Sequence, residues 1–280
     1  MKWVELCAGS AAVTLRLLGG EHAIPPVTYQ GSKRKYAGGI LEALGLRSGR
    51  GAESVILAEA GPWAEVWRYL SAGVALSPYM TAWNEQDDDE QAAFFVELRE
   101  ALPTMTGPAR AAAWLWLHQR SYGGKGPAAG MAPRHIASTP GRKQGEWRHT
   151  IDAPAPRLDT LSALAWPSTT VHHGDVRDLE PFGDAVVYMD PPYQAATRYA
   201  YDLPRGAVIE VADAWRAAGS VVAVSEAEPL DLAGWHHLDI TALRTMTPRN
   251  WSRQQGEWLT MSEPPATLAA VQFELFSPSV

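Results

Sequence analysis

Cysteine is almost missing from the chain, since Cys7 is the one cysteine among 280 residues. A single thiol excludes a disulfide scaffold and any zinc or iron–sulfur site built from several cysteines, and it is typical of a reducing compartment. The sequence also lacks an uninterrupted apolar run of about 18 residues, which a membrane-spanning helix needs. Its opening residues, Met-Lys-Trp-Val-Glu, lack the apolar segment of a signal peptide. We therefore expect a cytoplasmic protein that has no membrane partner.

An excess of positive charge is absent as well. The chain has 24 lysines and arginines against 31 aspartates and glutamates, a net charge of −7. This balance excludes a uniformly basic surface for nucleic acid, so any such contact has to be local. Hydrophobic residues make up 46% of the sequence and charged residues 20%, which predicts a packed core and not a disordered chain. We expect most of the 12 tryptophans to fill that core.

Short apolar runs that are typical of strands alternate along the chain with segments of helical periodicity. The expected strands are residues 2–6, 54–58, 169–172, 185–189 and 220–224, with residues 235–240 and 257–261 as candidates for a closing hairpin. The expected helices are residues 13–18, 33–44, 62–70, 91–102, 109–119, 158–164 and 207–218. This alternation predicts an α/β fold with a doubly wound, mostly parallel, Rossmann-like sheet. Ligands bind such sheets beyond the carboxyl ends of the strands, so the residues that follow each strand are the candidate site.

The sharpest motif follows the expected strand at 185–189 and reads Asp190-Pro191-Pro192-Tyr193. One explanation is a stiff loop at the strand exit, because two prolines fix the backbone there. The chemistry favours a site for the exocyclic amine of a nucleobase. The Asp190 carboxylate and the Pro191 carbonyl are two acceptors for the two N–H groups of an amine such as adenine N6. Tyr193 offers a flat face on which a flipped base can stack.

A second motif follows the first strand, where Glu5, Leu6, Cys7, Ala8, Gly9 and Ser10 lead into a helix. Small residues at a strand-to-helix turn let a ligand approach the backbone, and the helix N-terminus adds N–H donors. The turn lacks the three-glycine spacing of dinucleotide-binding folds, which argues against NAD. An ordinary tight turn explains the same residues equally well.

Charged residues stand at further positions near strand ends. Glu59 follows the second strand and suits ribose hydroxyls, and Asp175 follows the third strand and suits an adenine amino group. A solvated strand-end charge and a Gly-Asp turn are the alternatives. The segment from Tyr29 to Lys35 combines an aromatic ring, a glycine and three cations. Cations at the start of a helix oppose its dipole, so we expect a carboxylate or phosphate partner for Lys33 and its neighbours.

These segments together resemble the D12 class of DNA adenine-N6 methyltransferases, the DNA adenine methylase family. Residues 190–193 match its catalytic Asp-Pro-Pro-Tyr motif, Glu5 to Val13 are similar to its S-adenosylmethionine loop, and Tyr29 to Lys33 resemble its cofactor-contacting segment. Asp175 and Ser225 stand where the family has an acid near the cofactor adenine and a serine at a strand end. The resemblance spans most of the chain, excluding residues 120–157.

The resemblance implies a Rossmann-like methyltransferase fold and a site-specific enzyme that transfers a methyl group from S-adenosylmethionine to adenine N6 of a flipped-out base in double-stranded DNA. It implies catalytic roles for Asp190, Pro191, Pro192 and Tyr193 and no metal. The residues implied to bind the cofactor are Glu5, Cys7, Ala8, Gly9, Ser10, Tyr29, Lys33, Glu59, Asp175 and Asp190. Such enzymes act in bacterial or phage-infected cells, with or without a restriction endonuclease as partner. Cytosine N4, adenine in RNA, and a catalytically silent relative that binds nucleic acid stay as alternatives.

Between His118 and Arg157 the apolar periodicity disappears, and glycine, proline, arginine, histidine and serine dominate. Seven basic residues stand against two acidic ones there, which suits contacts with DNA phosphates. A mobile surface loop is the alternative. We expect a target-recognition insertion at residues 120–157 and an S-adenosylmethionine-dependent catalytic domain formed by residues 1–119 and 158–280. The candidate DNA contacts are Arg120, Lys125, Arg134, Arg142, Lys143 and Arg148.

Overall fold

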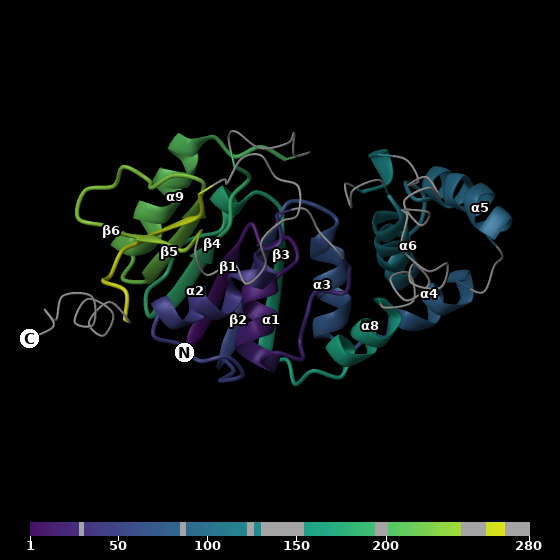
Figure 1. Ribbon diagram of the computed structural model, residues 1–280, viewed down its shortest axis with the longest axis horizontal. Coiled ribbons are helices and arrows are strands. Elements are labelled where there is room, and N and C mark those ends of the chain that lie inside the picture. The colour runs from purple at the N-terminus through teal and green to yellow at the C-terminus, as the bar shows by residue number, and fades with distance from the viewer. Residues whose placement is uncertain are drawn as a thin grey trace, which may run out of the picture. The chain divides into compact units, whose positions relative to one another are not determined.

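The computed structural model describes residues 1–27, 31–84, 88–121, 126–129, 154–193, 201–241 and 256–266. The chain divides into two compact units. The sheet unit comprises Met1–His22, Lys33–Ala64 and Pro167–Val280, and the helical unit comprises Ala23–Ser32 and Glu65–Trp166. Figure 1 labels most of the helices and strands of the two units.

A sheet forms the centre of the sheet unit and has seven strands over the described residues. In spatial order they are β3 (Ser168–His173), β2 (Ser54–Glu59), β1 (Lys2–Leu6), β4 (Ala185–Met189), β5 (Val221–Glu226), β7 (Trp258–Met261) and β6 (His236–Asp239). The strands from β3 to β5 are parallel, and β7 pairs antiparallel with both β5 and β6. This order confirms the predicted doubly wound, mostly parallel, Rossmann-like sheet with a C-terminal hairpin.

Helices cover both faces of the sheet, as the side chains of β1 show. Val4 and Leu6 belong to one buried cluster with α9 (Arg205–Ala217). The neighbouring Trp3 instead donates from its indole Nε1 to Thr14 Oγ1 of α1 (Ala12–Gly19) over 2.7 Å. Successive side chains of a strand point to opposite faces, so α9 and α1 lie on opposite sides of the sheet. Figure 1 shows this arrangement, with α2 (Ala37–Ala43) on the same side as α1.

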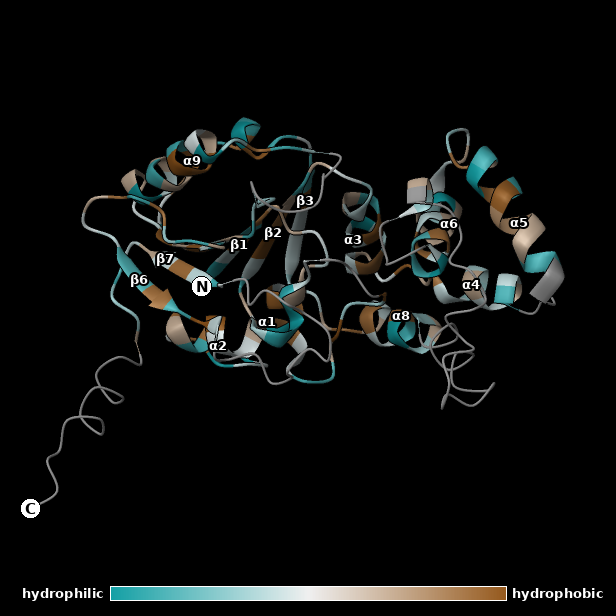
Figure 2. Cartoon of the chain, turned by 45° about the horizontal axis from the view of Figure 1, so that its top comes forward, coloured by the Kyte–Doolittle hydropathy of each residue, from teal (hydrophilic) through white to brown (hydrophobic). Residues whose placement is uncertain are grey.

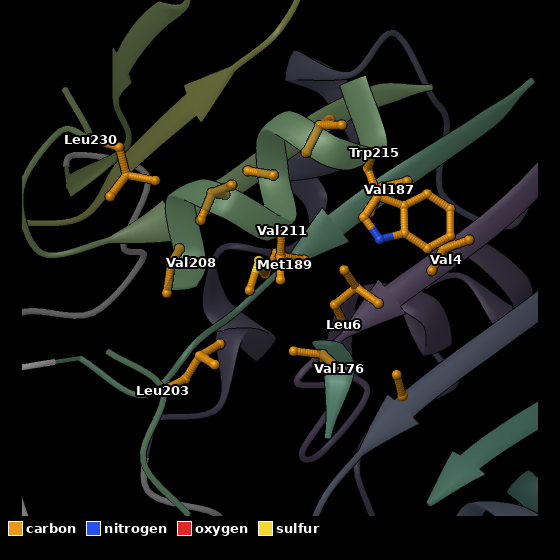
Figure 3. Close-up of a cluster of buried hydrophobic side chains, with 14 of the residues drawn as sticks. Val4, Leu6, Val176, Val187, Met189, Leu203, Val208, Val211, Trp215 and Leu230 are labelled. Carbon is orange, nitrogen blue, oxygen red and sulfur yellow. The ribbon is translucent and has the colours of Figure 1, made fainter. Parts of the chain in front are cut away.

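The cluster under α9 is an apolar core. Figure 3 shows Trp215 and Val211 of α9 beside Val187 and Met189 of β4. Burying one such side chain fully stabilises the fold by roughly 1.5–3 kcal/mol. The edge strand β6 differs, because three of its four residues are polar and exposed and only Leu238 is half-buried. In Figure 2 the strand is hydrophilic at its start and turns hydrophobic toward its end. A short, polar edge discourages pairing with a strand of another chain.

Most of the predicted helices are present with shifted ends: α1, α2, α3 (Trp63–Ser71), α5 (Asp88–Ala101), α6 (Gly107–Arg120), α8 (Pro154–Ser162) and α9. The predicted helix at 33–44 is wrong in its first part, because Lys33–Lys35 form a separate 3-10 turn, η1. Two more 3-10 turns are η3 (Pro127–Ala129) and η5 (Val176–Asp178). The sequence pattern does not predict α4 (Ser77–Asn84). Its buried residues are Ser77 and Met80, which is too few for an apolar stripe.

Aromatic and polar contacts hold the helical unit together. Trp116 of α6 is fully buried and meets Phe94 of α5 edge-on, with the ring centroids 5.3 Å apart. Ser77 of α4 donates a hydrogen bond to Asp159 of α8. Burial of tryptophan is general in the described residues, and it confirms the expected core role for Trp3, Trp63, Trp67, Trp116, Trp215 and Trp235.

The described residues contain neither a candidate membrane span nor a cluster of metal-ligating side chains. Within those ranges, none of the helices is both long and apolar enough to cross a membrane. The same ranges contain no group of three histidine, cysteine, aspartate or glutamate side chains arranged to hold a metal ion.

Candidate active site

The carboxyl ends of β1 and β4 form the point at which the strand order reverses. From β1 the chain adds β2 and β3 on one side, and it then returns to add β4 and β5 on the other. Doubly wound sheets bind ligands at this crevice. The backbone N–H of Asp190 donates to the Leu6 carbonyl over 3.1 Å, so the Asp-Pro-Pro-Tyr segment starts beside the loop that follows β1. The structure thus brings the two strongest sequence motifs together.

The loop after β1 has an unusual backbone. Cys7, Gly9 and Ala11 have φ angles of 55°, 45° and 47°. Residues other than glycine rarely adopt this left-handed conformation, and it costs about 1 kcal/mol or more where it occurs. The loop is nevertheless well fixed, since the Ala8 N–H donates to the Ala58 carbonyl over 3.0 Å and the Ala11 N–H to the Ala8 carbonyl over 2.6 Å. Strained backbone is typical of functional sites.

Glu59, at the end of β2, holds this loop. Its Oε2 accepts the Gly9 N–H and its Oε1 accepts the Gly61 N–H, both over 2.8 Å. Burial raises the pKa of Glu59, and the two backbone hydrogen bonds oppose that rise. We expected Glu59 to accept hydrogen bonds from a ribose. The structure shows it bound to the protein's own amides, although each carboxylate oxygen has a second lone pair for a ligand.

Glu5 lies beneath the same loop and is only 2% exposed. Its Oε2 accepts the Thr14 N–H over 2.8 Å and also the Thr14 hydroxyl. Burial raises the pKa of Glu5 from 4.5 to about 8; the Thr14 hydrogen bonds act against this, and the Asp190 carboxylate adds to it. Glu5 is therefore an internal acid that ties β1 to the first turn of α1.

Asp190 forms a cluster with Lys33, Tyr193 and Glu257. The Lys33 Nζ lies 2.7 Å from Asp190 Oδ1, 3.6 Å from Glu257 Oε1 and 4.5 Å from the centroid of the Tyr193 ring. The Tyr193 hydroxyl donates to Glu257 Oε1. Lys33 is 6% exposed, so its charge is balanced by these two carboxylates inside the protein. The carboxylate partner expected for Lys33 is thus Asp190, and Glu257 is a second carboxylate at a longer distance.

Burial sets the protonation of this cluster. It raises the pKa of Asp190, against which the Lys33 ammonium acts through its charge and its hydrogen bond. It also raises the pKa of Glu257, where Lys33 again opposes it. The Tyr193 hydroxyl has a pKa far above its ordinary value, because it is buried and near both carboxylates. Tyr193 is therefore neutral at physiological pH and acts through its ring and its O–H.

Polar side chains from β4 and β5 line the same end of the sheet. The hydroxyls of Tyr188 and Ser225 lie 2.8 Å apart and are fully buried. Glu226, the last residue of β5, is 3% exposed, and burial raises its pKa to about 7. Its Oε1 has no hydrogen-bond partner within the described part of the chain. The sequence motifs indicated Ser225 but not Tyr188, which lies inside the predicted strand at 185–189, and not Glu226, which follows the predicted strand at 220–224 but belongs to no motif.

Asp175 follows β3 and is held by its own neighbour. Arg177 donates to its carboxylate from the backbone N–H and from Nε, each over 2.9 Å. These hydrogen bonds lower the pKa of Asp175 to about 2. Burial raises the pKa of the Cys7 thiol, with Glu59, Asp190 and Asp175 as the contributing negative charges. The carboxylates that follow β2, β3 and β4 thus add to the effect of burial on the pKa of the thiol at the end of β1.

The remaining predicted site residues fall into two groups. Pro191 and Pro192 lead from β4 to Tyr193, and Ala8 and Ser10 are buried in the loop after β1. Tyr29 and the candidate DNA contacts Lys125, Arg134, Arg142, Lys143 and Arg148 lie outside the described residues. So does most of the expected recognition region at 120–157.

Arg120 differs from the exposed phosphate contact that we expected. It is 4% exposed at the end of α6, and its guanidinium lies 3.9 Å from the centre of the Trp116 ring. Its Nη2 donates to Asn84 Oδ1 over 2.7 Å. A long side chain that stacks on a buried indole and bonds within its own unit supports packing. The sequence shows that Arg120 is charged but does not show that its side chain is buried.

Comparisons with known proteins add little to this picture. No family model matches the sequence. No curated protein matches it either. Among solved structures, the chain is similar to the rRNA methyltransferase aviRa from Streptomyces viridochromogenes, with 16% sequence identity and a TM-score of 0.32. The alignment covers 93% of this chain and 76% of that chain. The assignment of the fold therefore rests on the strand order of the sheet itself.

Proposed function

We propose that the protein is a site-specific DNA methyltransferase that transfers a methyl group from S-adenosylmethionine to adenine N6 of a flipped-out base. The observation that carries this proposal is the position of Asp190 to Tyr193. They follow the central strand β4, beside the loop after β1 and at the reversal of the strand order. A nucleobase amine and a nucleoside cofactor would meet at that point of a doubly wound sheet.

The chemistry of the loop suits S-adenosylmethionine better than a dinucleotide. Glu59 already occupies the Gly9 N–H with a carboxylate, and a phosphate brought to the same position would be repelled by that charge. A cofactor that carries a sulfonium, an ammonium and ribose hydroxyl groups instead offers positive charges and donors to the carboxylates of Glu59, Asp175 and Asp190, which follow β2, β3 and β4. Glu59 and Asp175 are the acceptors we assign to it, with Glu5 as the support of the loop. When bound, S-adenosylmethionine supplies a methyl group activated by its sulfur.

Asp190 and the Pro191 carbonyl would act on the target amine. The lone pair of adenine N6 is delocalised into the ring, so the nitrogen is a poor nucleophile. Two acceptors that take its two N–H groups favour a tetrahedral nitrogen. The amine loses one proton as it gains a methyl group, and the Asp190 carboxylate is the acceptor at hand for that proton. Tyr193, neutral and fixed at its hydroxyl, offers its ring to the flipped base.

The test is methylation of double-stranded DNA by the purified protein with S-adenosylmethionine that carries a labelled methyl group. Digestion to nucleosides, chromatography and mass spectrometry then identify the product. We expect N6-methyladenine. A product of N4-methylcytosine, or label in RNA alone, would replace the proposed substrate with one of the alternatives. No labelled nucleoside together with no heat of S-adenosylmethionine binding would favour a silent nucleic-acid-binding protein.

Substitution of Asp190 links the reaction to the motif. We expect Asp190→Ala to lower the methylation rate by about 10²–10³ or more, the usual loss for a group that acts on the reacting atoms, with cofactor binding largely kept. Asp184→Asn is the matched control. Asp184 precedes β4 at its other end, is exposed, and has a φ of 58° that asparagine also accepts. Equal rates for Asp190→Ala and Asp184→Asn would remove the basis of the assignment.

A further inference from the structure

Glu257 contacts two residues of the candidate site but belongs to no motif that the sequence revealed. Its Oε1 accepts the Tyr193 hydroxyl and lies 3.6 Å from the Lys33 Nζ. The residue stands directly before β7, the strand that inserts antiparallel between β5 and β6. Its side chain is 9% exposed, so these contacts are shielded from water.

The backbone of Glu257 is anchored independently of the cluster. Its N–H donates to Thr241 Oγ1 over 2.9 Å, and its carbonyl accepts the Ile240 N–H over 2.9 Å. The hairpin of β6 and β7 therefore fixes the main chain at this residue. These main-chain hydrogen bonds do not involve the carboxylate, so a substitution of the side chain leaves them in place.

Within the described residues, the carboxylates of Asp190 and Glu257 both lie within reach of Lys33, and they compete for it. Its Nζ is at hydrogen-bond distance from Asp190 Oδ1, at 2.7 Å, and beyond that distance from Glu257 Oε1, at 3.6 Å. In the proposed reaction the Asp190 carboxylate has to accept an N–H of the target amine. A buried ammonium that turns away from Asp190 needs another negative charge, since an unpaired charge in the interior is costly. Glu257 is the neighbouring anion that meets this need.

Lys33 also lies against the ring that the flipped base would use. Its Nζ is 4.5 Å from the centroid of the Tyr193 ring. A base stacked on that face and an ammonium over the same face exclude each other. Movement of the ammonium toward Glu257 would uncover the ring while Glu257 keeps the Tyr193 hydroxyl in place.

We propose that Glu257 is a positioning residue, which fixes the Tyr193 ring through its hydroxyl and serves as the second counter-ion of Lys33, so that Asp190 becomes available to the target amine. This inference rests on the proposed function for the identity of the amine. The contacts that carry it are those of Glu257 with Tyr193 and Lys33.

The experiment compares Glu257→Gln and Glu257→Ala with the wild-type protein in the methylation assay. Glutamine keeps an acceptor for the Tyr193 hydroxyl but removes the charge that draws Lys33. We expect kcat to fall by about 10-fold for Glu257→Gln and toward 100-fold for Glu257→Ala, in the range seen when reacting groups are slightly misplaced. The KM for S-adenosylmethionine should change less than threefold, which corresponds to about 0.6 kcal/mol, because a positioning residue affects kcat more than KM. Rates within twofold of wild type for both variants would overturn the proposal.

A double variant distinguishes positioning from support of the fold. If Glu257 acts partly through the Tyr193 hydroxyl, the losses of Tyr193→Phe and Glu257→Ala overlap, and the double variant loses less than the product of the two single losses. Independent losses that multiply would contradict that link. Asp239→Asn is the control for the hairpin, because Asp239 Oδ1 accepts the Thr241 N–H on the same turn and does not belong to the cluster. We expect its rate and its melting temperature to match the wild type.

A second measurement needs no methyl transfer. Loss of the Glu257 charge makes the ammonium form of Lys33 less stable, so acetic anhydride should acetylate Lys33 several-fold faster at fixed pH in Glu257→Gln than in the wild type. Mass spectrometry of peptides gives this rate, with Lys35 as the internal reference. Unchanged acetylation of Lys33 would overturn the pairing of Lys33 and Glu257. Faster acetylation in a protein that methylates no DNA would support the pairing and refute the proposed function alone.

Discussion

The same two strands, β1 and β4, have very different surroundings along their lengths. Beneath α9 their side chains are Val4, Leu6, Val187 and Met189, all apolar and all buried. At their carboxyl ends stand a strained loop and Asp190, next to a buried lysine and further carboxylates. The first region stabilises the fold by excluding water, whereas the second buries charge, which weakens the fold unless each charge is paired. The apolar part of the two strands follows the usual preferences for burial and backbone conformation, whereas their carboxyl ends depart from them, as is typical of functional sites.

The largest effect on stability is expected in the α9 core. Trp215 is fully buried and meets Phe182 edge-on with the ring centroids 5.0 Å apart. Trp215→Ala removes this contact and leaves a cavity, so we expect a loss of about 3–5 kcal/mol in the free energy of unfolding. Urea unfolding measures it, with Trp215→Phe as a control that should lose clearly less. A loss below about 1 kcal/mol would mean that the core under α9 does not dominate stability.

A smaller effect, and one that depends on pH, is expected at the charged end. The pKa of Glu5 rises from 4.5 to about 8 on folding because the carboxyl is buried. The folded chain therefore keeps a proton that the unfolded chain releases in this range. Its contribution to stability is complete below pH 4.5 and disappears as the pH rises through about 8. The magnitude is on the order of a few kcal/mol.

Glu5→Gln isolates that contribution, because the amide keeps an acceptor for Thr14 and has no proton to release. We expect the difference in stability between the wild type and Glu5→Gln to shift in favour of the variant as the pH rises from 5 to 9. Melting temperatures at several pH values provide the measurement. A difference that stays constant with pH would show that Glu5 has the same pKa in the folded and unfolded chain. The strand ends would then not differ from the core in the way we expect.

The smallest effect is expected for an ion pair on the surface. Arg16 Nη2 lies 2.9 Å from Glu21 Oε1, and the Glu21 side chain is 79% exposed. Water and salt screen such a pair, so Glu21→Ala should change the free energy of unfolding by less than about 0.5 kcal/mol. Chemical denaturation at low and high salt checks this. A loss as large as that of a core residue would contradict the expectation that this exposed pair contributes less to stability than the buried pair of Lys33 with Asp190.

Sequence patterns predicted the parts of this molecule that depend on neighbours in the chain. The central strands β1, β2, β4 and β5 contain short apolar runs, and the Asp-Pro-Pro-Tyr motif was assigned to the end of β4. Parallel strands share one carboxyl edge, so the expected meeting of Asp190 with the loop after β1 followed from topology alone. The doubly wound fold was therefore predictable, whereas the order of the strands came from the structure.

Contacts between distant segments were not predictable in the same way. Glu257 is 64 residues from Tyr193 in the sequence, and no sequence periodicity predicts the hydrogen bond between them. Arg120 counts as a surface charge in the sequence, and only packing on Trp116 shows that it is buried. The start of the predicted helix at 33–44 also failed, because Lys33 is drawn into an ion pair and belongs to a separate turn. Tertiary partners decide such cases over local propensity.

The hydrogen bond from Gly9 to Glu59 has a consequence for how a ligand is received. A flexible glycine-containing loop loses conformational freedom when it closes on a small molecule, and that loss weakens binding. Here the Glu59 carboxylate at the end of β2 already holds the backbone of the loop after β1 in the folded chain. A nucleoside ligand would then dock onto a surface whose shape is already set, and association would proceed without a slow rearrangement of the loop.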